Sequence, residues 1–293
     1  MRQSQLGFLG LLGLGREHHL VARNRLKSLY IRLLGYPGIL PKITLAHTIN
    51  ELLGLDLPPE PTILDAGCGI GFLSFYLAGR FPGGRILGID VSDENVSMCN
   101  RIAAALGLSN VEFRVQRLEE IQEDSKFDLI CCADVLEHVP DDQRVLSNFR
   151  RALNRDGHLI VSVPLPMRDQ WQFIRIYAEI PQHAIEVATE HVRDGYKPED
   201  IDAKLNAAGF EICSRRFTFG KAGRIAFELS ILGWNRQKLW NVLSLLTYPI
   251  SIIPAYIDTR VKRTAGNAIV LTAALTTKGG RGSGRAAMHN GRD

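Results

Sequence analysis

Apolar residues along the chain fall into two patterns, short consecutive runs and longer stretches with an apolar residue at every third or fourth position. The short runs are typical of buried parallel strands, and the longer stretches are typical of amphipathic helices. The runs predict strands at 62–64, 85–91, 111–116, 127–135, 157–163, 210–219 and 268–275. The periodic stretches predict helices at 17–34, 44–53, 93–106, 142–153 and 197–208, and another that begins at Phe72. Strands that alternate with helices predict an α/β fold.

The stretch from Thr62 to Gly71 joins the first predicted strand to a helix through a glycine-rich turn. Asp65 ends the strand, and Gly67, Gly69 and Gly71 follow at alternate positions. Glycines let the backbone turn sharply and let a ligand approach without meeting a Cβ. The stretch therefore predicts a ligand-binding loop, and the alternative is a turn that binds nothing.

The carboxylate of Asp65 separates two classes of ligand. A dinucleotide-binding loop reads G-x-G-x-x-G, and here the third glycine comes one residue early. A carboxylate at the mouth of the loop would repel a pyrophosphate and attract a cation such as an α-ammonium group. S-adenosylmethionine, which has an amino-acid end, a ribose and an adenine, fits better. A nicotinamide-dependent dehydrogenase is the disfavoured alternative.

A second acid, Asp90, stands at the end of the next predicted strand, one βαβ unit after the glycine loop. A carboxylate at that strand tip can accept hydrogen bonds from both ribose hydroxyls. We therefore expect Asp65 to orient the methionine end of the ligand and Asp90 to hold its ribose.

Four segments in this order and spacing resemble the class I S-adenosylmethionine-dependent methyltransferases, in particular methyltransferase type 11 and the ubiquinone-pathway O-methyltransferases. They are the glycine loop, the strand that ends in Asp90, FDLICCADV at 127–135 and NRDGHLIVSVP at 154–164. The resemblance implies methyl transfer and a Rossmann-like, seven-stranded, mostly parallel sheet with an antiparallel last strand. It also implies helices on both faces and a helical insertion before the last strand. A protein of this fold that binds the cofactor without catalysis is an alternative.

The resemblance and the composition of the chain together predict five parts. Residues 1–60 are expected to form helices that cover the cofactor site, 61–219 the methyltransferase core, 220–266 an apolar helical insertion, 267–275 the last core strand and 276–293 a disordered tail. Residues 1–15 are apolar and glycine-rich, and no clear cleavage site follows them. We expect this segment to be disordered or to touch a membrane, and a secretory signal is the disfavoured alternative.

Adenine recognition departs from the family pattern. Many relatives have an acidic residue just after the third strand that bonds the adenine amino group, whereas this chain has Arg117 there. We expect the backbone N–H of Leu118 to read the adenine, with Glu119 or Glu120 as candidate helpers. The predicted cofactor-binding residues are Asp65, Gly67, Gly69, Gly71, Asp90, Val91, Leu118 and Ala133.

His138 and His191 are the predicted catalytic residues. His138 follows the fourth strand, at the sheet edge where open α/β folds bind ligands, and histidine exchanges protons near neutral pH. In relatives, a histidine at the place of His191 lines the active site. Either residue would remove a proton from a hydroxyl acceptor. The alternative for His138 is a structural bond within the following turn.

The segment CADVLEHVP resembles a stretch that can hold a divalent cation in ubiquinone-pathway O-methyltransferases. Asp134, Glu137 and His138 match the ligands by type, although aspartate is shorter than the glutamate expected at the first position. Three ligands from one turn would need added waters. No metal is predicted, and a cation at these residues stays an open alternative.

The composition of the chain limits the kinds of partner and the cellular location that we expect. The net charge of +4 is slight for 293 residues and does not suggest nucleic acid. The five cysteines are odd in number and none lies in a C-x-x-C pair, which argues against zinc and is typical of a reduced, cytosolic protein. We expect a cytoplasmic protein, with peripheral attachment to the inner face of a membrane as a further hypothesis.

Residues 239–257 carry no charge over a length close to that of a membrane helix, which needs ~20 residues. We expect no membrane span, because both flanking strands must join one sheet and because Pro249 and Pro254 are expected to break the run. Basic and aromatic residues flank or interrupt it: Trp234, Arg236, Lys238, Trp240, Tyr248, Tyr256, Arg260, Lys262 and Arg263. We predict an insertion that lies on a membrane surface. A substrate lid and a dimer contact are the alternatives.

The predicted membrane-surface insertion bears on the class of methyl acceptor. An apolar insertion favours a lipid-like acceptor, such as a quinone precursor or a lipid-linked sugar, over a small soluble metabolite. Two other segments have open interpretations. Residues 171–187 could form a lid over the substrate or pack in the core, and the basic helix at 17–34 could cap the domain or lie against an anionic membrane.

Overall fold

The computed structural model describes residues 5–22, 24–166, 192–231 and 237–276 of the 293. The predicted lid at 171–187, His191, Trp234, Arg236 and all but the first residue of the predicted tail lie outside these ranges.

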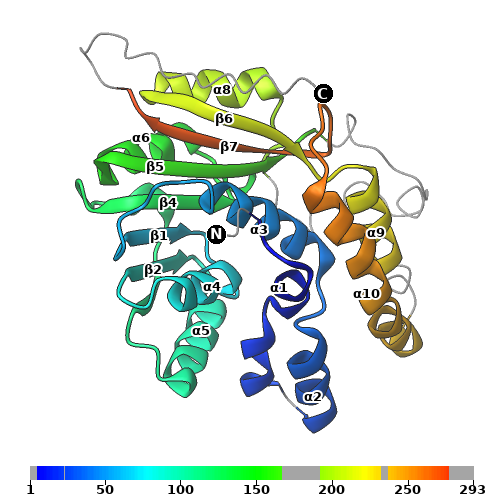
Figure 1. Ribbon diagram of the computed structural model, residues 1–293. Coiled ribbons are helices and arrows are strands. Elements are labelled where there is room, and N and C mark those ends of the chain that lie inside the picture. The colour runs from blue at the N-terminus through cyan, green and yellow to red at the C-terminus, as the bar shows by residue number, and fades with distance from the viewer. Residues whose placement is uncertain (1–4, 23, 167–191, 232–236, 277–293) are drawn as a thin grey trace, which may run out of the picture.

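A seven-stranded sheet forms the centre of the molecule (Figure 1). Its strands are β1 (Thr62–Ala66), β2 (Arg85–Asp90), β3 (Val111–Val115), β4 (Phe127–Ala133), β5 (Leu153–Pro164), β6 (Phe210–Thr218) and β7 (Ala268–Leu275). The order across the sheet is β3-β2-β1-β4-β5-β7-β6. β7 runs antiparallel to β5 and β6, and the pairs among β1 to β5 are parallel. This topology confirms the predicted Rossmann-like, mostly parallel sheet with an antiparallel last strand.

The central strands are buried on both faces, which explains their consecutive apolar residues. Neighbours along a strand point to opposite faces, so Ile63 belongs to one hydrophobic cluster and Leu64 to another. Ile63 is in register with Ile86 of β2 and Leu129 of β4, and all three belong to the same cluster. The sheet therefore separates two cores, and each core needs its own layer of helices.

Helices cover both faces of the sheet, as predicted. One core includes residues of α6 (Asp142–Ala152) and α8 (Pro198–Ala207). The other includes residues of α3 (Ile39–Leu52) and α4 (Phe72–Arg80), and α5 (Asp93–Leu106) packs beside α4 around Phe75 and Phe113. Ser92 caps α5 as expected, since its hydroxyl accepts the N–H of Asn95 at 3.2 Å.

Residues 5–15 are ordered and include a helix, so the expectation of disorder over residues 1–15 is wrong for the described part. Helix α1 (Phe8–Gly13) packs on the core with Leu11 buried. The ammonium group of Lys42, in α3, donates to the carbonyls of Leu11, Leu12 and Leu14 at 3.2, 3.0 and 2.6 Å. A buried cation thus binds the carbonyl end of this short helix.

The predicted helices at 17–34 and 44–53 also have different limits in the structure. The first divides into η1 (Arg16–Val21) and α2 (Arg25–Leu34), because Asn24 caps α2 by accepting the N–H of Lys27 at 2.8 Å. The second, α3, begins at Ile39, with Pro41 in its first turn, where a missing N–H costs little.

The insertion before the last strand is helical, as predicted, and consists of α9 (Lys221–Ile231) and α10 (Gln237–Arg260). The expectation that Pro249 and Pro254 break the run is wrong, because α10 continues through both. Each proline removes one N–H, and Pro254 leaves the carbonyl of Ile250 on the exposed side of the helix, where water can bind it. No helix in the described ranges combines the length and the hydropathy needed to cross a membrane.

Candidate functional site

The glycine loop lies between β1 and α4, at the carboxyl edge of the sheet. The N–H groups of Gly67 and Cys68 both donate to the carbonyl of Ile89 in β2, at 2.8 and 2.9 Å. Strand order reverses here, because β1 has β2 on one side and β4 on the other. Open α/β sheets bind ligands in the crevice at such a switch point.

The three glycines of the loop all have left-handed backbones, with φ of 78°, 52° and 84° at Gly67, Gly69 and Gly71. A Cβ on Gly67 would clash with a methyl of Val135, and one on Gly71 would lie 2.9 Å from the sulfur of Cys99. A Cβ on Gly69 would meet nothing within 4 Å. Gly67 and Gly71 thus permit close packing, whereas Gly69 faces the open space that a ligand needs.

Asp90 fixes the shape of the loop from the end of β2. Its carboxylate accepts the N–H of Gly69 at 2.8 Å and the N–H of Ser92 at 2.9 Å, one on each oxygen. A carboxylate oxygen has a second lone pair, so each can also accept a hydroxyl. Asp90 therefore fits the predicted ribose contact. Val91 follows with 65% of its surface exposed, an apolar surface beside that carboxylate.

Asp65 lies deeper than the sequence suggested. Its side chain is buried, at 4% exposure, and accepts the hydroxyl of Ser74 in α4 at 2.6 Å. Burial raises the pKa of Asp65 to about 6, against the lowering effect of the hydrogen bonds from Ser74, and the charge of Asp90 raises it further. The acid is thus beneath the loop rather than at an open mouth, and in the absence of a cation it takes up a proton at higher pH than an exposed aspartate does.

The N-terminal segment closes over the glycine loop through a residue that the sequence analysis missed. His18 of η1 is buried, and its Nε2–H donates to the carbonyl of Ile70 at 2.8 Å. Its ring meets that of Phe72 edge-on, with centroids 5.1 Å apart. No sequence signal marked this role, because His18 belonged to a stretch predicted as one regular helix.

A second polar cluster lies at the end of β4, around Asp134. This residue has a φ of 55°, and its carboxylate accepts the hydroxyls of Thr44 at 2.7 Å and Ser162 at 3.3 Å. Burial raises the pKa of Asp134. Thr44 was not predicted to matter, yet it joins α3 to the same edge of the sheet as the glycine loop.

Glu137 and His138 follow in η3 (Leu136–His138) and differ in exposure. Glu137 is buried, and its Oε2 has no hydrogen-bond partner in the described part of the chain. Burial, and then the charge of Asp134, raise the pKa of Glu137 well above its ordinary value. His138 is exposed. The described residues contain no cluster of three or more histidine, cysteine, aspartate or glutamate side chains placed to hold a metal.

The remaining predicted contacts lie around the loop. Ala133, the last residue of β4, is partly exposed, whereas the side chain of Leu118 is buried. Leu118 begins η2 (Leu118–Glu120), and its carbonyl accepts the amide of Asn148 in α6 at 3.1 Å. All five cysteines of the chain are free, and four are buried.

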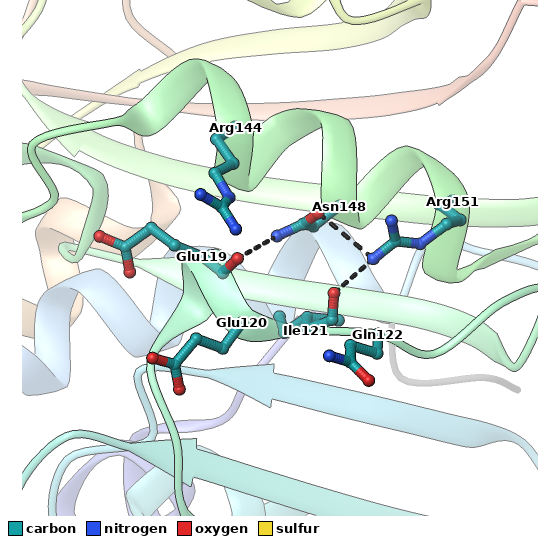
Figure 2. Close-up of a pocket in the computed structure, with 7 residues that line it drawn as sticks. All are labelled: Glu119, Glu120, Ile121, Gln122, Arg144, Asn148 and Arg151. Carbon is teal, nitrogen blue, oxygen red and sulfur yellow. Dashed lines mark hydrogen bonds between the residues drawn. The ribbon is translucent and has the colours of Figure 1, made fainter.

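A cavity of about 250 Å³ lies between η2 and α6 (Figure 2). It is lined by Glu119, Glu120, Ile121, Gln122, Arg144, Asn148 and Arg151. The amide of Asn148 donates to the carbonyl of Glu119 at 3.0 Å, and Arg151 donates to that of Ile121. These bonds attach η2 to α6 and so fix the position of Leu118. Glu119 and Glu120, the candidate adenine helpers, line this cavity.

Comparison with known proteins gives a family match. The family model described as a methyltransferase domain matches residues 59–208, just over half of the chain. The ubiquinone biosynthesis O-methyltransferase of Hahella chejuensis is 29% identical over 160 residues. The match covers 54% of this chain and 66% of that protein. The chain therefore spans a little under two thirds of the length of that curated relative.

Solved structures share the fold. The [4+2]-cyclase SpnF has a TM-score of 0.56 at 20% identity, over 90% of this chain and 95% of its own. Phosphoethanolamine N-methyltransferase 2 of Haemonchus contortus, in complex with S-adenosylmethionine, has a TM-score of 0.56 at 16% identity, over 92% of this chain and 58% of its own. At these identities the likeness concerns the fold alone.

Proposed function

We propose a reaction for this chain, which belongs to the methyltransferase-domain family and, within it, to the class I S-adenosylmethionine-dependent methyltransferases. It transfers a methyl group to a hydroxyl of a lipid-like acceptor, such as a quinone precursor or a lipid-linked sugar, with residues 61–219 as the catalytic core. The observation that carries the proposal is the pair of carboxylates, Asp65 and Asp90, at adjacent strand ends beside the glycine loop.

The residues around the loop fit the cofactor. The buried carboxyl of Asp65 would pair with the α-ammonium group, and the open side of Gly69 leaves room for the methionine chain. Asp90 keeps lone pairs for the ribose hydroxyls. Val91 and Ala133 would contact the adenine ring, and the Leu118 N–H would bond its edge. When bound, S-adenosylmethionine supplies a methyl group on a positively charged sulfur that is already activated for displacement.

The protein chiefly positions the acceptor and removes its proton. Correct orientation of two reactants supplies a large part of the rate in such displacements. His138 lies on η3, directly after the end of β4, and is exposed, so an acceptor can reach it. We propose His138 or His191 as the base that takes the hydroxyl proton. Replacement of both with alanine should lower turnover by about 10²–10⁴-fold and leave cofactor binding unchanged. Normal turnover in that double variant would eliminate both candidates.

Two features support a lipid-like acceptor. The Hahella relative is named for ubiquinone biosynthesis, and helix α10 exposes a row of apolar side chains. We propose that the protein works peripherally on the inner face of a membrane. A small soluble acceptor would need no such surface.

A protein that binds the cofactor without catalysing methyl transfer is the second candidate, because one fold can serve different functions and the [4+2]-cyclase SpnF shares this one. The test is an incubation with methyl-tritiated S-adenosylmethionine and a membrane lipid extract. Label in the organic phase supports the proposed function. Label only in a water-soluble product would replace the acceptor class, and binding without any transfer would favour the non-catalytic candidate.

A further inference from the structure

Helix α10 exposes one continuous apolar row. Leu246, Ile250, Ile253 and Ile257 are 48–66% exposed, at intervals of three and four residues that place them on one side of the helix. The opposite side carries Tyr248, Ile252 and Ala255, which are all buried. Four large apolar side chains in a single row, about 17 Å long at 1.5 Å per residue, exceed the scattered exposure that a soluble surface normally has.

Helix α2 carries a second row. Leu26, Leu29 and Leu33 are 53–82% exposed and again share one side of their helix. The two helices are joined by Tyr248, whose hydroxyl donates to the carbonyl of Leu34 at 3.2 Å and whose ring centroid lies 6.4 Å from that of Tyr30. In Figure 1, α2 and α10 project from the same end of the molecule. We call the two rows together the apolar face.

The charges around the apolar face have one sign. Helices α2, α9 and α10 contain two acids in their described parts, Glu228 and Asp258, and both are buried. The exposed cations of the same helices are Arg25, Lys27, Arg32, Lys221 and Arg260. Helical periodicity places Arg25 and Arg32 on one side of the α2 row and Lys27 on the other. Long basic side chains beside an apolar row are typical of helices that lie in a membrane interface.

This charge pattern indicates which partner binds the apolar face. A second copy of the chain, packed symmetrically, would bring the same cations against one another with no exposed acid of these helices to balance them. An anionic bilayer offers apolar chains to the two rows and negative headgroups to the cations.

We propose that the apolar face of α2 and α10 docks the protein on the surface of an anionic lipid bilayer. This docking proposal rests on the proposed function, because the docked protein would take its lipid-like acceptor from the bilayer. Helix α3 connects the two regions, since His47 donates to Asp258 of α10 at 3.1 Å and Thr44, one turn earlier, donates to Asp134 at 2.7 Å. One side of helix α3 therefore contacts both the helix that carries the apolar face and the candidate acceptor site.

The test measures sedimentation of the full chain with phosphatidylcholine vesicles, with and without phosphatidylglycerol. Wild type should bind the anionic vesicles and lose binding as salt rises. Ile250→Glu with Ile253→Glu should weaken binding by roughly tenfold for each substitution. Leu106→Glu is the control, since Leu106 is an exposed apolar residue of α5 that does not belong to the apolar face. It should bind like wild type.

A second pair of variants tests the cations. Lys27→Glu with Arg32→Glu should weaken binding to anionic vesicles by about tenfold or more. The charge-matched control, Arg101→Glu with Arg155→Glu, changes exposed residues elsewhere and should have little effect. Calorimetry with S-adenosylmethionine shows that each variant is folded.

Three results would overturn the proposal: no binding of wild type to anionic vesicles, equal binding by the Ile250/Ile253 variant, or a wild-type dimer in solution that this variant dissociates. Methyl transfer to a detergent-dispersed membrane lipid extract separates the two proposals. Vesicle binding without transfer would remove the proposed function and leave the docking face, whereas transfer without vesicle binding would do the reverse.

Discussion

Replacement of Asp65 with asparagine is expected to stabilise the protein and to weaken cofactor binding at the same time. Asparagine has nearly the same shape and can still accept the hydroxyl of Ser74, which lies 2.6 Å from the Asp65 carboxylate. It removes the negative charge that burial disfavours and that an ammonium group would need. The structure therefore predicts opposite signs for stability and for binding.

The magnitude follows from the pKa. Asp65 is buried, and its pKa rises from an ordinary value of 3.8 to about 6 in the folded protein. A folded pKa above the unfolded one means that the protonated acid favours folding, and this contribution is lost as pH rises from about 4 through about 6. The difference corresponds to at most about 3 kcal/mol. The free energy of unfolding of Asp65→Asn should thus equal that of wild type below pH 4 and exceed it by up to about 3 kcal/mol at pH 8.

Urea unfolding at pH 4, 6 and 8 measures the stability change, and calorimetry measures binding of S-adenosylmethionine. Loss of one charge-assisted contact should weaken binding by about 10- to 100-fold, and wild-type binding should weaken as pH falls below about 6. Asp124→Asn, which changes an exposed acid, is the control and should alter neither property. A variant that is less stable than wild type at pH 8, or that binds the cofactor equally well, would refute the reasoning.

Three further changes test the structure. Gly71→Ala should lower the free energy of unfolding by about 1–3 kcal/mol and weaken cofactor binding, because φ is 84° and the new Cβ would lie 2.8 Å from a ring carbon of Phe75. The control is Gly79→Ala in α4, where a Cβ meets nothing within 4 Å. In the same unfolding experiment this control should be neutral or slightly stabilising. Asp258→Ala should cost about 3–5 kcal/mol at pH 7, because it leaves a buried ion pair broken. Burial alone would raise the pKa of Asp258, but the hydrogen bond from His47 and nearby positive charge hold that pKa below its ordinary value. The stability that the Asp258 carboxylate contributes should therefore disappear as pH falls through its folded pKa. An unchanged midpoint of acid unfolding in the variant would contradict a stabilising role for Asp258. Lys42→Met should speed hydrogen exchange at residues 11–14 more than in the sheet, and uniform exchange would argue against its role at the end of α1.

The sheet could be predicted because each strand is a consecutive apolar run. Ile63 and Leu64 are both buried on opposite faces, so no other periodicity competes with the strand interpretation. Asp90 could be placed for a similar reason, since a strand end in a parallel sheet has a fixed edge. Ser92, directly before α5, had an unambiguous capping signal.

The helices of the N-terminal part and the insertion were harder to predict because distant residues determine them. Residues 6–14 contain no charge, and the cation that binds the end of α1 is Lys42, about thirty residues away. Asn24 was read as part of a continuous helix although its side chain caps a new one. Pro254 is tolerated because the carbonyl it leaves without a donor faces outward, which depends on how α10 packs.

The depth of Asp65 shows the same limit at the site. The sequence places an acid beside the glycine loop, but its exposure depends on Ser74 below it and on η1 above the loop. His18 and Thr44 each bond a group more than fifty residues away, and neither belongs to a recognisable motif. Contacts of this kind are set by packing and have no local signal.

The most direct test of the account follows tritium from methyl-labelled S-adenosylmethionine into lipids extracted after incubation with membranes, for wild type and for Asp90→Asn. Asp90 is the residue whose carboxylate both fixes the loop and faces the proposed ribose position. The account predicts label in the organic phase for wild type and a loss of at least tenfold for the variant. Equal labelling of the organic phase by both proteins, or no label in that phase with wild type, would contradict it.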